Sequence, residues 1–306
     1  MMWFFAIFAM AGGAAQLVDG TLGMGFGVTS ATILLSMGVT AAAASAATHA
    51  AKLPTTFVSG LTHWRRGNVD TGTFLRIAVP GAIMAFIGAV VLVNLSLATA
   101  KTWMSGLLLL LGLVIFLRFG FNRRLIPAPR RGHTARWLSP IGALGGLVDS
   151  LGGGGWGPVV TPSLMTVTNH EPRKVVGSVN AAEFFVALFA SAGFLTGAEK
   201  LENDMPWFAV LGLVTGGVIV APFAARLAGR LPHHVMGTLV GGLILLVNGQ
   251  VLLLAAGVAA SATWWVMAAA AVATAVVAKA SYVYDKAERA AASASETSST
   301  ELSARP

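Results

Sequence analysis

Long apolar stretches follow one another along most of the chain and are separated by short polar connections. Seven of them approach the length of about 20 residues that a membrane-spanning helix needs. The predicted spans cover residues 41–64, 73–94, 100–119, 173–197, 206–225, 235–256 and 262–284. The pattern therefore predicts an all-α fold, a polytopic transmembrane helical bundle.

Two further apolar stretches, residues 3–38 and 137–170, are each interrupted by glycines after a Val-Asp pair. When Asp19 is aligned with Asp149, three glycines coincide. They are Gly23, Gly25 and Gly27 in the first stretch and Gly153, Gly155 and Gly157 in the second. A polar break inside apolar helices is tolerated only where it lines a cavity within the protein. A matching pair of breaks in two halves of a chain points to the binding site of a transporter.

Charge supports the membrane assignment and suggests an orientation. Only 10% of the residues are charged, whereas a soluble domain has about 25%. Arginines gather in three connections, which the positive-inside rule places in the cytoplasm. They are Arg65, Arg66 and Arg76; Arg118, Arg123, Arg124, Arg130, Arg131 and Arg136; and Arg226 and Arg230. The acidic connection with Glu199, Glu202 and Asp204 is then extracellular, so corresponding helices of the two halves run in opposite directions.

This arrangement predicts two inverted repeats, each with a glycine-broken segment and three spanning helices. Each broken segment must then enter and leave on one side, as a re-entrant hairpin; a single crossing is the alternative. The predicted regions are a first repeat at 1–126, a basic cytoplasmic linker at 127–136, a second repeat at 137–260, and at 261–306 an extra transmembrane helix followed by a disordered cytoplasmic tail. The N-terminus is expected outside and the C-terminus in the cytoplasm of a multi-pass protein.

The predicted helix 41–64 carries a polar face inside an otherwise apolar sequence. Its members recur at steps of three and four residues and so lie on one side. They are Ser45, His49, Lys52, Thr56, Ser59 and His63. A charge near mid-membrane costs a few kcal/mol or more, so Lys52 should face a cavity or a partner. The alternative is a seam of small and hydroxyl residues that packs against another helix.

The second half offers partners for these residues. A shift of one residue aligns His49 with Asn180 and Lys52 with Glu183. Either Lys52 and Glu183 form one structural ion pair, or Lys52 attracts an anion and Glu183 carries a coupling proton; we favour the second. Asp19 and Asp149 are candidates for helix caps or for a proton relay.

The glycines let the backbone approach a ligand closely. The helix N-termini after Gly27 and Gly157 favour an anion there, and tight helix packing is the alternative role of the glycines. The predicted substrate-binding residues are Gly23, Gly25, Gly27, His49, Lys52, Gly153, Gly155, Gly157 and Asn180, and the predicted proton-coupling residues are Glu183, Asp19 and Asp149.

Other classes of function have little support in the sequence. The chain has no cysteine, and we find no phosphate-binding loop, metal-ligand spacing or nucleophile constellation. We therefore expect no enzyme activity, no cofactor and no metal. The net charge of +8 reflects the cytoplasmic arginines, so no nucleic-acid partner is expected. The expected partners are a small anion and the lipid bilayer, and a homo-oligomer is left open.

Residues 17–30, the run from Ser45 to Lys52, residues 59–69, and the second-half segments 152–158 and 177–183 resemble the sulfite exporter TauE/SafE family. The resemblance covers about residues 1–256. It implies a secondary transporter of sulfur-containing or small organic anions, such as sulfite or sulfonates, in a bacterial-type inner membrane. Lys52 departs from the family pattern, since relatives often carry an acidic residue there, so substrate charge or ion coupling can differ in this chain.

We predict proton-coupled export of a small anion by alternating access around the two glycine breaks. A channel-like facilitator is the nearest alternative. A membrane enzyme would need a catalytic constellation, and a scaffold that transports nothing would have no use for charges near mid-membrane in both halves.

Overall fold

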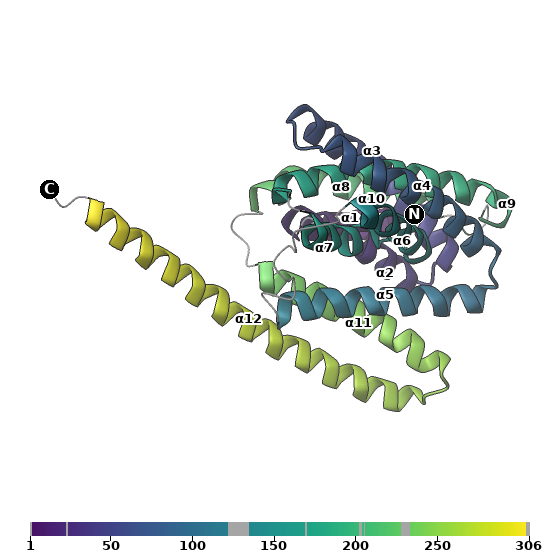
Figure 1. Ribbon diagram of the computed structural model, residues 1–306. Coiled ribbons are helices and arrows are strands. Elements are labelled where there is room, and N and C mark those ends of the chain that lie inside the picture. The colour runs from purple at the N-terminus through teal and green to yellow at the C-terminus, as the bar shows by residue number, and fades with distance from the viewer. Residues whose placement is uncertain are drawn as a thin grey trace.

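A computed structural model describes residues 2–22, 24–121, 135–168, 170–201, 204, 206–227 and 233–303, and the regular elements within them are helices (Figure 1). They are α1 (Met2–Leu22), α2 (Phe26–Ser36), α3 (Ala41–Arg65), α4 (Thr71–Asn94), α5 (Leu97–Gly120), α6 (Ala135–Gly152), α7 (Trp156–Val167), α8 (Pro172–Leu195), α9 (Ala198–Leu201), α10 (Trp207–Leu227), α11 (His233–Ala255) and α12 (Ala260–Ser303). The predicted all-α helical bundle is confirmed.

Five helices of the described chain are long and apolar enough to cross a membrane. These segments are Thr71–Asn94, Leu97–Gly120, Lys174–Leu195, Gly237–Ala255 and Ala260–Val283. Predicted spans 41–64 and 206–225 are helical as well, as α3 and α10. The polar face of α3 lowers its mean hydropathy, and the apolar part of α10, Trp207–Val220, is shorter than the other five.

Both glycine-containing stretches are broken where the sequence predicts an interruption. The first break lies between α1 and α2, and the second lies between α6 and α7. Gly25 has a φ of 131° and Gly153 a φ of 71°. Residues with a Cβ rarely adopt such positive φ angles, so glycine is what allows the chain to turn at these two points. The predicted site residue Gly23 lies outside the described residues.

The two halves of the chain pack in matching pairs. Helix α1 lies along α10, and α4 lies along α6; α3 packs against α8, and α5 packs against α11. Each helix has a counterpart in the other half of the chain. Replacing every helix by its counterpart (α1 by α6, α3 by α8, α4 by α10 and α5 by α11, and the reverse) gives the same four pairs. Figure 1 shows the broken segments and α10 grouped in the middle, with α5 and α11 along one side. The two halves therefore share one plan of helix contacts, while their directions across the membrane stay a prediction.

Glycines allow the closest of these helix contacts. A Cβ on Gly216 of α10 would overlap the carbonyl oxygen of Ala9 on α1, and one on Gly146 of α6 would overlap that of Gly81 on α4. Close backbone approach through small residues is a principal source of packing energy between helices in a membrane. Glycines outside the breaks thus allow close packing between helices.

Helix α12 departs from the prediction at its C-terminal end. It is a single helix of 44 residues that continues to Ser303 and runs away from the bundle (Figure 1). The sequence predicts a disordered tail from residue 291 onward, whereas α12 is helical as far as Ser303. Alanine and glutamate favour helix, and a helix that already exists is extended at little cost. Most of the predicted linker 127–136 lies outside the described residues, and α6 begins at Ala135 within it.

The connection between α3 and α4 is tied to the second half. The Asp70 carboxylate accepts a hydrogen bond of 2.7 Å from the backbone N–H of Thr73, which caps α4 and lowers the pKa of Asp70. The backbone N–H of Asp70 donates to Ser178 Oγ of α8 at 2.9 Å. This end of α4 is therefore anchored to the helix that carries Asn180 and Glu183.

We expect Gly146→Ala to destabilise the protein by about 1–3 kcal/mol, because the added Cβ meets the backbone of α4, which cannot rotate away. Thermal unfolding in detergent would measure the change. Gly106→Ala is the matched control, since a Cβ there meets nothing within 4 Å. Equal unfolding temperatures for Gly146→Ala and the wild type would contradict the close α4–α6 contact.

Candidate functional site

The two glycine breaks meet in the interior of the bundle. A Cβ on Gly27, at the start of α2, would lie 2.6 Å from the Cα of Gly154 and 2.8 Å from Cε of Lys52. A Cβ on Gly154 would in turn overlap the backbone of Gly27 and Val28. Side chains at these two positions would push the breaks apart, so the pair of glycines sets how closely the two halves approach here.

Asp149, at the end of α6, collects donors from both halves of the chain. Its side chain is fully buried. Lys52 Nζ lies 2.9 Å from Oδ1 and 3.3 Å from Oδ2, and His49 Nε2 lies 3.1 Å from Oδ2. The backbone N–H groups of Gly155 and Trp156 donate to Oδ1 at 2.7 and 3.0 Å. The turn after Gly152 brings the chain back so that the unbonded N–H groups at the start of α7 face this carboxylate.

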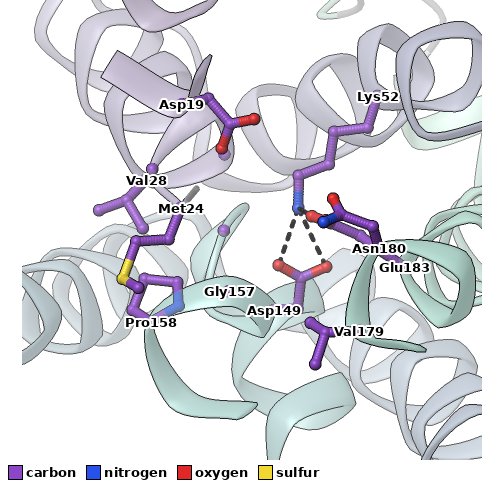
Figure 2. Close-up of a pocket in the computed structure, with 13 residues that line it drawn as sticks. Asp19, Met24, Val28, Lys52, Asp149, Gly157, Pro158, Val179, Asn180 and Glu183 are labelled. Carbon is purple, nitrogen blue, oxygen red and sulfur yellow. Dashed lines mark hydrogen bonds and ion pairs between the residues drawn. The ribbon is translucent and has the colours of Figure 1, made fainter. Parts of the chain in front are cut away.

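Lys52 lies between two carboxylates. Besides Asp149, its Nζ is 3.0 Å from Glu183 Oε1, and 3% of its side chain is exposed. Figure 2 shows the ammonium group pointing at Asp149, with Glu183 and Asn180 beside it. The ion pair between Lys52 and Glu183, one of the two arrangements considered from the sequence, is thus present. It connects α3 with α8, its counterpart in the second half.

His49 bonds to the carboxylate of Asp149 and helps to hold it in position. Its Nδ1 lies 2.8 Å from the carbonyl oxygen of Ser45, so both ring nitrogens face oxygen acceptors. Ser45 Oγ donates to the carbonyl oxygen of Ser150 at 2.6 Å, which fastens α3 to the end of α6. His49 therefore acts on the carboxylate and does not line the cavity.

Asp19 occupies the equivalent place in the first half but is held less tightly. Its Oδ1 accepts a hydrogen bond of 3.3 Å from the backbone N–H of Phe26, the first residue of α2. In Figure 2, Asp19 and Asp149 lie on opposite sides of the space between the breaks. Both aspartates therefore cap the helix that follows their break, as one of the sequence alternatives proposed, although the α7 cap has more donors.

A small cavity lies between these groups. Its lining consists of Asp19, Met24, Gly25, Gly27, Val28, Lys52, Asp149, Gly154, Gly157, Pro158, Val179, Asn180 and Glu183. Its volume of about 10 Å³ is room for about one water molecule. This conformation is therefore closed around the charged groups and has no space for an oxyanion of several heavy atoms.

Most of the predicted site residues come together here. Those that line the cavity are Gly25, Gly27, Lys52, Gly157, Asn180, Asp19, Asp149 and Glu183. His49 and Gly155 contact Asp149, and Gly153 makes the positive-φ turn and packs against Ala31. The structure thus supports a shared location for these residues, while their individual roles remain proposals.

The sequence missed five lining residues: Met24, Val28, Gly154, Pro158 and Val179. Gly154 makes the closest contact of the site, yet it aligns with Met24 and so fell outside the repeated glycine pattern. The uninterrupted run from Gly152 to Gly155 was the available signal, since the first break has no such run. Among the described residues, no group of three or more His, Cys, Asp or Glu side chains is arranged to hold a metal ion.

We expect Asp149→Ala to destabilise the protein by about 3–5 kcal/mol, because Lys52 and the N–H groups of α7 lose their acceptor inside the protein. Asp149→Asn should cost less, since an amide oxygen can still cap α7. Thermal unfolding in detergent would rank the variants, with the exposed Glu199→Ala as control. If Asp149→Ala unfolds at the same temperature as the wild type, the four donors do not depend on this carboxylate.

The chain is similar to known membrane proteins along most of its length. Residues 8–251 match the family described as sulfite exporter TauE/SafE. The chain is 44% identical over 249 residues to the probable membrane transporter protein YtnM of Bacillus subtilis (strain 168), covering 80% of this chain and 82% of that protein. No solved structure matches the chain. Together with its apolar spans, these matches show that the chain belongs to the TauE/SafE sulfite exporter family of multi-pass membrane transporters.

Proposed function

We propose that this protein is a proton-coupled secondary transporter of a small sulfur-containing or organic anion, such as sulfite or a sulfonate. The observation that carries the proposal is the buried Lys52 ammonium group at the meeting point of the two glycine breaks. A lysine kept charged within a membrane protein is a functional group by default. Membership of a family named for sulfite export supports an anionic substrate.

The anion would bind beside Lys52, at the start of α2. The N–H groups at the start of α7 already serve Asp149, whereas Asp19 holds the start of α2 by one bond of 3.3 Å. Gly25 and Gly27 line the cavity there and leave the backbone accessible. A helix N-terminus with a nearby cation suits a small oxyanion. The amide of Asn180, which also lines the cavity, would add a donor.

Alternating access would follow from the contact between the two breaks. The closed cavity requires that the α1–α2 and α6–α7 segments separate on one side of the membrane before an anion can reach Lys52. The matching helix pairs of the two halves support an inverted repeat, in which each break opens toward a different side. The N-terminus would then lie outside and the C-terminus in the cytoplasm, as the arginine distribution indicates.

Purified protein in proteoliposomes would test the function directly. We expect uptake of sulfite or methanesulfonate, but not of a neutral solute of similar size, and accumulation above equilibrium when a pH gradient is imposed. Equilibration without accumulation would identify a facilitator, and absence of flux for every anion would contradict transport by this chain.

We expect Lys52→Gln to reduce anion flux at least about tenfold, because a charge-assisted hydrogen bond to the anion contributes about 1.5–3 kcal/mol. Initial rates in proteoliposomes would measure the loss. Lys101→Gln removes an exposed lysine at the start of α5 and is the matched control. Lys52→Arg, which keeps the charge, should retain more flux than Lys52→Gln. Unchanged flux in a folded Lys52→Gln protein would remove Lys52 from the substrate site.

A further inference from the structure

We propose that the Glu183 carboxylate occupies the binding position of the substrate anion beside Lys52. When Glu183 takes up a proton, it leaves Lys52 and the anion binds in its position. Anion and proton then cross the membrane together in the same direction. This inference rests on the proposed anion transport. It adds which carboxylate is displaced and the relative direction of the two fluxes.

The two carboxylates that contact Lys52 are held very differently. Asp149 is fully buried and receives bonds from Lys52, His49 and two backbone N–H groups. In the described part of the chain, Glu183 has one partner, Lys52, and 17% of its side chain is exposed. A group held by one bond leaves more easily than a group held by several. Glu183 is therefore the carboxylate that an incoming anion can replace, while Asp149 stays as the fixed counter-ion of Lys52.

Charge balance favours loss of one negative charge when the anion is bound, and the ion pair with Lys52 makes Glu183 the group to lose it. Three carboxylates line the cavity, Asp19, Asp149 and Glu183, against one ammonium group. His49 adds at most one positive charge, so the ionised cluster already has more negative than positive charge. A further anion at the same place would face strong repulsion in surroundings of low dielectric constant. Protonation of Glu183 removes one negative charge and frees Lys52 in the same step.

Glu183 is surrounded by few other titratable groups that could share this role. Helix α3 presents Lys52 and His49, α6 presents Asp149, and α1 presents Asp19. Helices α2 and α7 contain no titratable side chain, and Arg76 of α4 is exposed. Asp19 also faces the start of α2, where the anion would bind, but its carboxylate accepts from the backbone N–H of Phe26 and is not paired with Lys52 in the described part of the chain. Glu183 alone among the carboxylates combines an ion pair with Lys52 and partial exposure.

Binding of the proton to Glu183 and binding of the anion must strengthen each other equally. If a proton on Glu183 favours anion binding, the anion must favour the proton by the same factor. A carrier that moves mainly when both are bound performs symport, and the anion accumulates on the alkaline side of the membrane. Export driven by protons that enter the cell would instead require the anion to expel the proton, which this charge balance opposes.

Anion binding at several pH values tests the proton on Glu183. The probe is methanesulfonate, which stays a monoanion between about pH 5 and about pH 8. We expect its Kd for the wild-type protein to rise about tenfold per pH unit above the titration of Glu183, as expected for one linked proton. Glu183→Gln should change Kd less than about twofold over this range. Glu199→Gln, an exposed glutamate outside the site, should keep the wild-type dependence.

Proton movement during methanesulfonate uptake provides the second measurement and needs no variant. Wild-type proteoliposomes containing a pH-sensitive dye should acidify inside as the anion enters. Alkalinisation inside, or no proton movement, would overturn symport even if Glu183→Gln failed to fold. A Glu183→Gln protein with the wild-type pH dependence would exclude Glu183 as the proton carrier. Absence of any methanesulfonate or sulfite flux would instead defeat the proposed function itself, so the two failures can be told apart.

Discussion

The contact between Lys52 and Asp149 is the interaction on which the rest of the structure depends. It places a full positive charge inside a membrane protein, where an unpaired ion would cost several kcal/mol. Asp149 can hold that charge because the start of α7 and His49 also bond to it. The ion pair therefore joins α3 of the first half to the broken segment of the second, and the remaining charged groups are arranged around it.

The ion pair between Lys52 and Asp149 depends on the close contact between the glycines of the two breaks. Lys52 reaches Asp149 past the point where Gly27 and Gly154 touch, and a methyl group on Gly27 would meet both Gly154 and Cε of Lys52. The breaks thus do more than interrupt two helices. They bring the two halves close enough for Lys52 to pair with both Asp149 and Glu183, beside a space the size of a water molecule that Asp19 also lines.

The features of the fold and the site that depend on local sequence patterns could be predicted from the sequence. Helix periodicity located the spans and the polar face of α3. The aligned Val-Asp and glycine motifs located both breaks and part of the lining, and the matching helices of the two halves added Lys52, Asn180 and Glu183. It did not predict that Lys52 bonds to Asp149 as well as to Glu183, because that contact depends on how two breaks cross in space. Gly154 escaped notice because it aligns with Met24 and so lies outside the repeated glycine pattern. The helical end of α12 was missed because composition weighs average polarity and neglects the extension of an existing helix.

The pairing of α3 with α8 has a consequence for the origin of the chain. These helices are counterparts that pack against each other, and they carry Lys52 and Glu183 at nearly equivalent positions. If the halves descend from one duplicated segment, a symmetric pair of identical copies would have brought two lysines or two glutamates together at this contact. Opposite charges here became available to selection only once both copies were free to diverge. On that descent, the ion pair marks the divergence of the two copies, and a chain built from two identical halves would lose it.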